Sequence, residues 1–217
     1  MAESAQRPDT SDMAAVHKVF RGSLASAPTF VGSAAGDDAR RALIANYYTN
    51  LMSFLEAHHG GEEEIIFPRL VDRLPAQRAV VETAEGQHHE VTGLIEDVKK
   101  SVGTWEEIGD PGAGALVASL QSLNDALIPH LDEEEAKIVP LAGEVMTVEE
   151  WGMLPGHALG SFTGDKIWLI MGLIRENFTQ QQRDMMLAHM PPPARQMWES
   201  MGESSFGELI AQVRQTA

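Results

Sequence analysis

Two segments of the chain pair a histidine with a glutamate four residues later, His58 with Glu62 and His130 with Glu134. The histidine, the glutamate and a trailing proline each recur 72 residues apart (130 − 58, 134 − 62 and 140 − 68). Residues four apart on an α-helix lie on one face at about 6 Å, so an imidazole nitrogen and a carboxylate oxygen can reach one metal ion or two adjacent ions. The repeat therefore predicts a metal site built from two matching halves.

Each of these segments is preceded by a predicted helix with a histidine on its apolar stripe, His17 in the first half and His88 in the second. The separations are nearly equal, since 58 − 17 is 41 and 130 − 88 is 42. Two helical hairpins of this pattern would pack into a bundle with these side chains pointing inward. The predicted ligands of a two-ion site are His17, His58, Glu62, His88, His130 and Glu134.

Duplicate histidines leave two of these positions open. His59 could replace His58, and His89 lies 72 residues after His17 (89 − 17), which keeps the repeat offset better than His88 does. The faces that carry His59 and His89 hold mostly acidic neighbours, whereas those of His58 and His88 hold mostly apolar ones. We therefore favour His58 and His88 and keep the other two as alternatives.

Several of these features also have ordinary explanations. A single His-x-x-x-Glu pair on an acidic helix is usually a surface hydrogen bond, and the acidic runs 62–64 and 132–135 alone would form solvated faces. Two in-register copies, each after a helix with an inward histidine, are much harder to explain that way. We expect Tyr47 and Tyr48 to pack in the core and His157 to be an ordinary residue of the tail.

Composition narrows the classes of function. Asp plus Glu is 32 against 16 for Lys plus Arg, a net charge of −16, so neither nucleic acid nor an anionic membrane surface is an expected partner. With Cys 0, disulfides and thiolate-ligated clusters are excluded. The longest apolar run, 167–174, has 8 residues where a membrane span needs roughly 20. The N-terminus lacks the apolar stretch of a secretory signal, so we expect a cytoplasmic protein.

Hydrophobic periodicity predicts an all-α protein without strands. Helices are expected over about 12–26, 38–70, 76–100 and 115–142, with loops at 27–36 and 103–114. These helices would form an antiparallel four-helix bundle over 12–142, preceded by a flexible N-terminus over 1–11. Residues 143–217 are predicted to form a C-terminal extension of short helices, which could provide an interface between copies of the chain.

Gly60 and Gly61 fall inside the second expected helix. Two glycines in a helix cost roughly 2 kcal/mol together relative to alanine, so a local interaction must offset that cost. Metal ligation across this turn would do so. The alternative is that the helix breaks there.

The residues quoted above resemble the hemerythrin-like proteins, also called the HHE cation-binding group. The resemblance covers about residues 12–142 and is most specific at the two His-x-x-x-Glu segments, with Phe67-Pro68 and Val139-Pro140 behind them. The tail around 146–151 is similar to that of actinobacterial members with a C-terminal extension. The resemblance implies two non-haem iron ions that are bridged by Glu62, by Glu134 and by an oxo or hydroxo group. It also implies four terminal ligands, His17, His58, His88 and His130.

The sequence departs from the oxygen-carrying hemerythrins at two positions. Those proteins carry a second histidine four residues after the third-helix ligand, where this chain has Thr92, and an aspartate where it has Glu134. A missing histidine would leave one iron more open to exogenous ligands, which favours turnover over reversible oxygen carriage.

We therefore predict a diiron oxidoreductase acting on hydrogen peroxide or nitric oxide. Reversible oxygen binding for sensing or storage is the first alternative, and iron or zinc buffering by a structural site is the second. Imidazole and carboxylate ligands suit iron, manganese or zinc, and the choice of iron comes from the resemblance.

Overall fold

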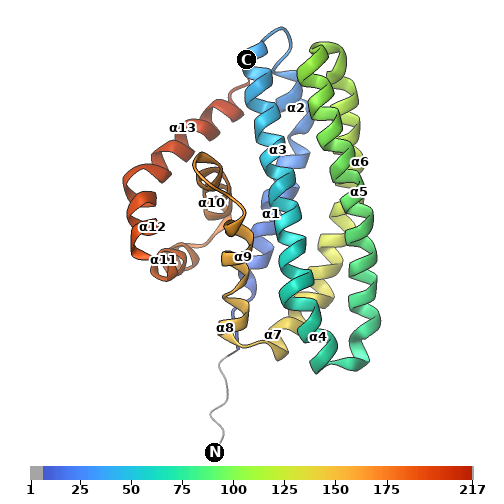
Figure 1. The fold of residues 1–217 in the computed structure, drawn as a ribbon, viewed down its shortest axis with the longest axis vertical. Helices are drawn as coiled ribbons and strands as arrows, with labels where there is room; N and C mark the ends of the chain where they lie inside the picture. The colour runs from blue at the N-terminus through green and yellow to red at the C-terminus, as the bar shows by residue number, and fades with distance from the viewer. Residues whose placement is uncertain (1–6, 217) are drawn as a thin grey trace, which may run out of the picture.

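The computed structural model describes residues 7–216, and four long helices lie side by side along its length (Figure 1). They are α1 (Ser11–Ala25), α3 (Asp38–Gly61), α5 (Arg78–Ile108) and α6 (Asp110–Glu133). Successive long helices run in opposite directions, and no strand occurs among the described residues. The prediction of an all-α antiparallel four-helix bundle is confirmed.

Two of the long helices continue through a π-helical turn. α3 leads into η1 (Glu62–Ile66) and α4 (Phe67–Arg73), and α6 leads into η3 (Glu134–Ile138) and α7 (Val139–Val145). Pro68 and Pro140 explain both turns, because proline lacks an N–H and its ring clashes with the carbonyl four residues earlier. A widened turn relieves that clash, and such π-bulges are frequent at functional sites. The sequence repeat is thus also a repeat of backbone geometry.

Two predicted loops are wrong. Residues 27–36 include the helix α2 (Ala27–Gly32), whose Pro28 lies in the first turn, where a missing N–H costs little. α5 runs on to Ile108, so the only break before α6 is Gly109, at a φ of 72°. Gly112 allows α6 to approach α5 closely, since a Cβ there would lie 2.8 Å from the Trp105 Cα. Glycine serves helix contact here and does not make a long loop.

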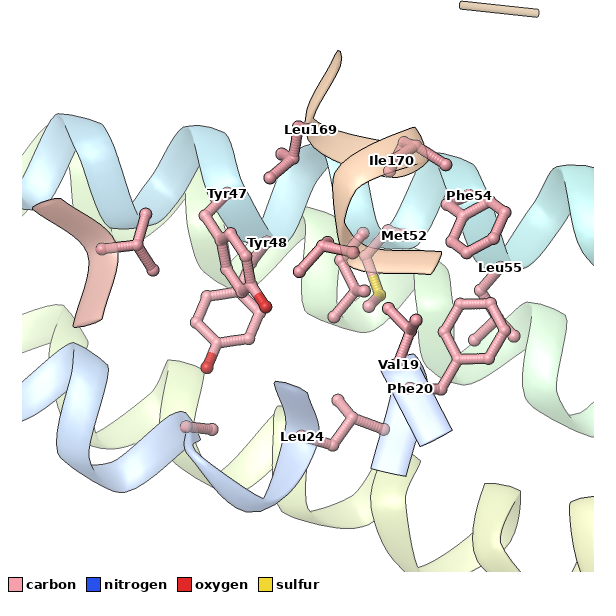
Figure 2. Packing of buried hydrophobic residues seen from close by; sticks show 14 of the residues in the cluster. Val19, Phe20, Leu24, Tyr47, Tyr48, Met52, Phe54, Leu55, Leu169 and Ile170 are labelled. Atoms are coloured by element: carbon pink, nitrogen blue, oxygen red, sulfur yellow. The ribbon is translucent and has the colours of Figure 1, made fainter. Parts of the chain in front are cut away.

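The buried apolar side chains form two clusters. The large cluster fills most of the bundle, and Figure 2 shows Phe20, Tyr48 and Phe54 in it, beside Leu169 and Ile170. Tyr47 and Tyr48 are buried in this core, in agreement with their predicted packing role, and both of their hydroxyls hydrogen-bond to Ser23. The small cluster comprises Met13, Ile65, Ile66, Phe67, Leu70, Val81, Ala84, Ile138, Ala142, Met146 and Trp151.

Between the two clusters lies a layer of buried polar residues. On α1, Met13 of the small cluster and Phe20 of the large cluster lie on either side of His17. The same alternation occurs on α5. A polar layer enclosed by apolar side chains on both sides is shielded from water, which strengthens electrostatic interactions within it.

The C-terminal extension lies along one side of the bundle, against α1 and α3 (Figure 1). Its elements are α8 (Val148–Trp151), α9 (Leu154–Gly160), α10 (Asp165–Asn177), α11 (Gln180–His189), α12 (Pro192–Met197), η4 (Trp198–Gly202) and α13 (Glu203–Arg214). α10 is the most apolar of these and packs on both bundle helices. None of the described helices has the length and hydropathy needed to span a membrane.

Candidate metal centre

All six predicted ligands lie in the polar layer, with exposures between 0 and 7 %. The Glu134 carboxylate lies 3.7 Å from the His17 Nε2, 3.4 Å from the His88 Nε2 and 3.4 Å from the His130 Nε2. The Glu62 carboxylate lies 3.5 Å from both the His58 Nε2 and the His88 Nε2. Six side chains from distant parts of the sequence therefore converge on one place.

These separations are longer than a good hydrogen bond, which is about 2.7–3.2 Å. They suit pairs of atoms that each lie about 2.1 Å from a shared metal ion. Within residues 7–216, several of these buried atoms have no hydrogen-bond partner: His17 Nε2, His58 Nε2, His130 Nε2, Glu62 Oε2 and Glu134 Oε2. Leaving a buried polar atom unpaired costs about 1–3 kcal/mol, so the site fits the metal ions that the family resemblance implies. That each residue binds metal remains a prediction.

His59, the alternative to His58 in the sequence analysis, belongs to the same layer as His58. Its side chain is 4 % exposed, and neither ring nitrogen has a partner among the described residues. The ring stacks on His88 with centroids 4.0 Å apart and meets the edge of His130 at 5.2 Å. Its alternative in the second half, His89, is exposed, in agreement with the preference for His88.

The donor atoms fall into two groups that could each hold an ion. His17, His58, Glu62 and Glu134 form one group, and His59, His88 and His130 form the other, with donors within 4.8 Å of one another. Adjacent residues on a helix point about 100° apart, so α3 can direct His58 toward α1 and His59 toward α5. The His17 and His58 rings are 5.2 Å apart on the first side.

His59 also changes the meaning of Thr92. The Thr92 hydroxyl donates to the His88 carbonyl at 2.8 Å, so it is engaged with its own helix. No histidine follows four residues after His88, but α3 places a fifth buried imidazole, that of His59, against His88. The absence of a histidine at position 92 is therefore no longer sufficient to infer that one ion lacks a histidine ligand.

Three of the histidines hydrogen-bond on the side away from the centre. The His17 Nδ1 lies 2.8 Å from Glu135, the His88 Nδ1 2.9 Å from Glu63 and the His130 Nδ1 3.1 Å from the Gln87 amide oxygen. An acceptor at Nδ1 keeps the proton there and leaves Nε2 free to bind metal. The acidic runs 62–64 and 132–135 are thus not entirely solvated, because Glu63 and Glu135 hydrogen-bond to buried histidines.

Burial controls protonation in this layer. It lowers the pKa of His58 and His59 well below the ordinary value, and it lowers the pKa of His130 to about 4. Burial, with the neighbouring Glu134, raises the pKa of Glu62 well above its usual range. His58, His59 and His130 are therefore neutral near pH 7, which is the form that binds metal.

A pH dependence of the metal-free protein follows from His59. Because its pKa is lowered on folding, the unfolded chain binds a proton that the native protein does not, once the pH falls below about 6.5. Stability should fall with pH in that range by up to about 1.4 kcal/mol per unit for this one group. Urea unfolding at pH 7.5 and 5.5 should show a smaller loss for His59→Phe than for the wild type. An equal loss would show that His59 is not held neutral.

Comparison with known families supports the presence of a cation-binding domain. A sequence model of the hemerythrin HHE cation binding domain matches residues 9–142, more than half of the chain. The chain belongs to this family. No curated protein and no solved structure matches it. The metal-binding character of the HHE domain agrees with the buried histidine and glutamate groups, and the match ends before α8.

The C-terminal extension contacts α3 at Gly60 and Gly61. A Cβ on Gly60 would lie 3.3 Å from the His157 ring, and one on Gly61 would lie 3.4 Å from both His157 and Leu154. His157 is half-buried there, and its Nε2 lies 3.2 Å from the Glu64 carboxylate. The helix does not break at these glycines, and His157 is more than an ordinary tail residue. The glycines give α9 room to pack beside His58 and His59.

Two substitutions at Gly61 should distinguish the effect of helix propensity on stability from the effect of the contact with α9. Gly61→Ala is expected to be neutral or to stabilise the metal-free protein by up to about 1 kcal/mol, because a Cβ meets only ordinary contacts. Gly61→Leu is expected to destabilise it by about 1–3 kcal/mol, since the longer side chain must displace His157 or Leu154. Urea unfolding gives both values, and limited proteolysis should cut near α9 faster only in the leucine variant. Equal stability of the two variants would contradict the tight packing of α9.

Proposed function

We propose that this HHE protein holds two iron ions and uses them to decompose hydrogen peroxide. His17 and His58 would hold one ion, His59, His88 and His130 the other, and Glu62 and Glu134 would bridge them. The observation that carries the proposal is the enclosed layer of imidazole and carboxylate atoms without other partners. Such ligands suit iron, and two adjacent ions can together exchange two electrons with a small substrate.

Peroxide is the preferred substrate because its decomposition needs no other reactant. Two molecules of hydrogen peroxide give two of water and one of oxygen, so one peroxide is reduced by two electrons that the other supplies. Reduction of two nitric oxide molecules to nitrous oxide and water consumes two electrons and two protons from outside. Nitric oxide reduction therefore depends on a separate electron donor, which makes nitric oxide the weaker candidate.

Negative charge around the centre supports turnover. Glu63 and Glu135 both hydrogen-bond to the candidate ligands, and within residues 7–216 only Glu135 has a cationic side chain, Arg21, in ion-pair range. Negative charge nearby favours the more highly charged ferric state through Coulomb attraction. A reversible oxygen carrier needs a long-lived ferrous pair, which this environment disfavours.

A hollow at the surface offers a place of approach for a small molecule. It has a volume of about 410 Å³ and is lined by Pro8, Asp9, Thr10, Ser11, Ala14, Glu135 and Val139. Glu135 lines this hollow and contacts His17 at 2.8 Å. A molecule of the size of peroxide entering here would come within one side chain of the candidate ligands.

Reversible oxygen binding is the second candidate, and His59 is the observation that favours it. With His59 the chain offers five imidazoles, the number that the oxygen-carrying relatives use according to the resemblance. The two candidates differ in a single assay of the iron-loaded protein. Oxygen release from added peroxide, above a His58→Ala control, is expected for turnover. No release, combined with absorption changes that reverse when oxygen is removed, would overturn the peroxide proposal in favour of oxygen binding.

A further inference from the structure

The glutamate that follows each bridging glutamate reaches into the other half of the bundle. Glu63 follows Glu62 in the first half, and its carboxylate accepts a hydrogen bond from the His88 Nδ1 of the second half at 2.9 Å. Glu135 in the second half accepts one from the His17 Nδ1 of the first half at 2.8 Å. The two glutamates lie 72 residues apart (135 − 63), so this exchange belongs to the internal repeat.

We propose that Glu63 and Glu135 are positioning residues that orient His88 and His17 for metal binding, each across the boundary between the two halves. The inference rests on the proposed metal site. By accepting from Nδ1, each carboxylate fixes the tautomer and the ring angle and makes the imidazole a stronger ligand. Neither half can then complete its own set of oriented ligands, and the centre forms only when both hairpins are docked.

The burial of the two histidines makes this orientation effective. His17 and His88 lie in the enclosed polar layer, where the described side chains offer each Nδ1 only its glutamate as partner. His88 is the imidazole whose Nε2 approaches both bridging glutamates, at 3.5 Å from Glu62 and 3.4 Å from Glu134. A small rotation of this ring would move Nε2 away from both of them.

The two contacts differ in charge. Glu135 also accepts from Arg21 at 3.1 Å, and Arg21 lies 2.8 Å from Asp132. Glu63 is half-exposed, and across residues 7–216 no lysine or arginine lies within ion-pair range of it. The negative charge of Glu63 is therefore less neutralised by a cationic side chain than that of Glu135, so Glu63 interacts more strongly with His88 than Glu135 does with His17. Loss of the Glu63 charge should have the larger effect on metal affinity.

The test measures ferrous iron affinity of the full-length protein without oxygen, by competition with a chromogenic chelator. Glu63→Gln and Glu135→Gln are each expected to weaken iron binding by about 10-fold or more, the range typical of residues that hydrogen-bond to a metal ligand. Of the two variants, Glu63→Gln is expected to bind iron more weakly. Glu64→Gln and Asp132→Asn are matched controls. Each removes one charge from the same acidic run, but these carboxylates contact His157 and Arg21 and no candidate ligand. The controls should stay within about twofold of the wild type.

Metal-free stability separates positioning from a merely structural bond. A structural bond would lower the urea midpoint of the metal-free variants and leave iron affinity unchanged, which would overturn the inference. Wild-type affinity in both glutamine variants would also overturn it. Should Glu63→Gln fail to fold, Glu63→Asp keeps the charge on a shorter side chain and is expected to bind iron more weakly than the wild type. If the wild type itself binds no iron, the proposed function fails instead.

Discussion

Replacing Glu134 by glutamine is expected to release both metal ions and to lower the melting temperature of the metal-loaded protein by roughly 10 °C. The Glu134 carboxylate lies beside imidazoles from α1, α5 and α6, so an amide in its place removes the carboxylate that both ions would share in the proposed site. A ligand present at 1,000 times its dissociation constant stabilises a fold by about 4 kcal/mol, and a chain of this size loses about 2–4 °C per kcal/mol.

The same substitution should have the opposite sign in metal-free protein. Without an ion, Glu62 and Glu134 are buried close together, and burial and their mutual repulsion raise the pKa of Glu62. Removing one carboxylate relieves this, so metal-free Glu134→Gln should be as stable as the wild type or more so. Thermal unfolding with and without metal measures both effects. A variant less stable in both states by the same amount would contradict a metal-binding role for Glu134.

The second large effect is expected at His59. His59→Ala should reduce the bound metal below two ions per chain and destabilise the metal-loaded protein by about 2–4 kcal/mol, because it removes a proposed ligand and leaves a cavity beside His88. His89→Ala is the matched control. The His89 side chain is exposed, so this substitution should change the stability of the protein by less than about 0.5 kcal/mol. Full metal content in His59→Ala would remove His59 from the site.

Much of the architecture follows from local sequence patterns. The apolar stripes of the long helices predict the bundle, and the stripe around His88 correctly separates it from the exposed His89. The repeat of histidine, glutamate and proline predicts where the two halves meet. These features are readable because helical spacing and in-register repetition are properties of the chain itself.

Sequence patterns offered His59 only as a replacement for His58 and not beside it, for a geometric reason. Helical periodicity distinguishes one buried face per helix, but α3 contacts neighbours on more than one side, and the buried donor atoms form two groups. The doubled histidine at 58 and 59, just before the first bridging glutamate, was the available signal. It required knowing that both faces of α3 are buried at this level.

Contacts between the halves and with the tail are equally invisible in the sequence. Glu63 and Glu135 are acidic residues in acidic runs, and only tertiary packing shows that each reaches a histidine of the other hairpin. Gly60 and Gly61 indicated a local peculiarity, but their partner His157 lies far along the chain. Gly112 was misleading because glycine marks close helix contact as well as turns.

We propose that the chain binds two iron ions in one buried centre. Metal analysis of the full-length protein, loaded with iron and freed of excess by gel filtration, tests it most directly. We expect two iron ions per chain in the wild type and in His89→Ala, and fewer in His59→Ala and Glu134→Gln. No iron in the wild type, or an equal amount in all four proteins, would contradict it.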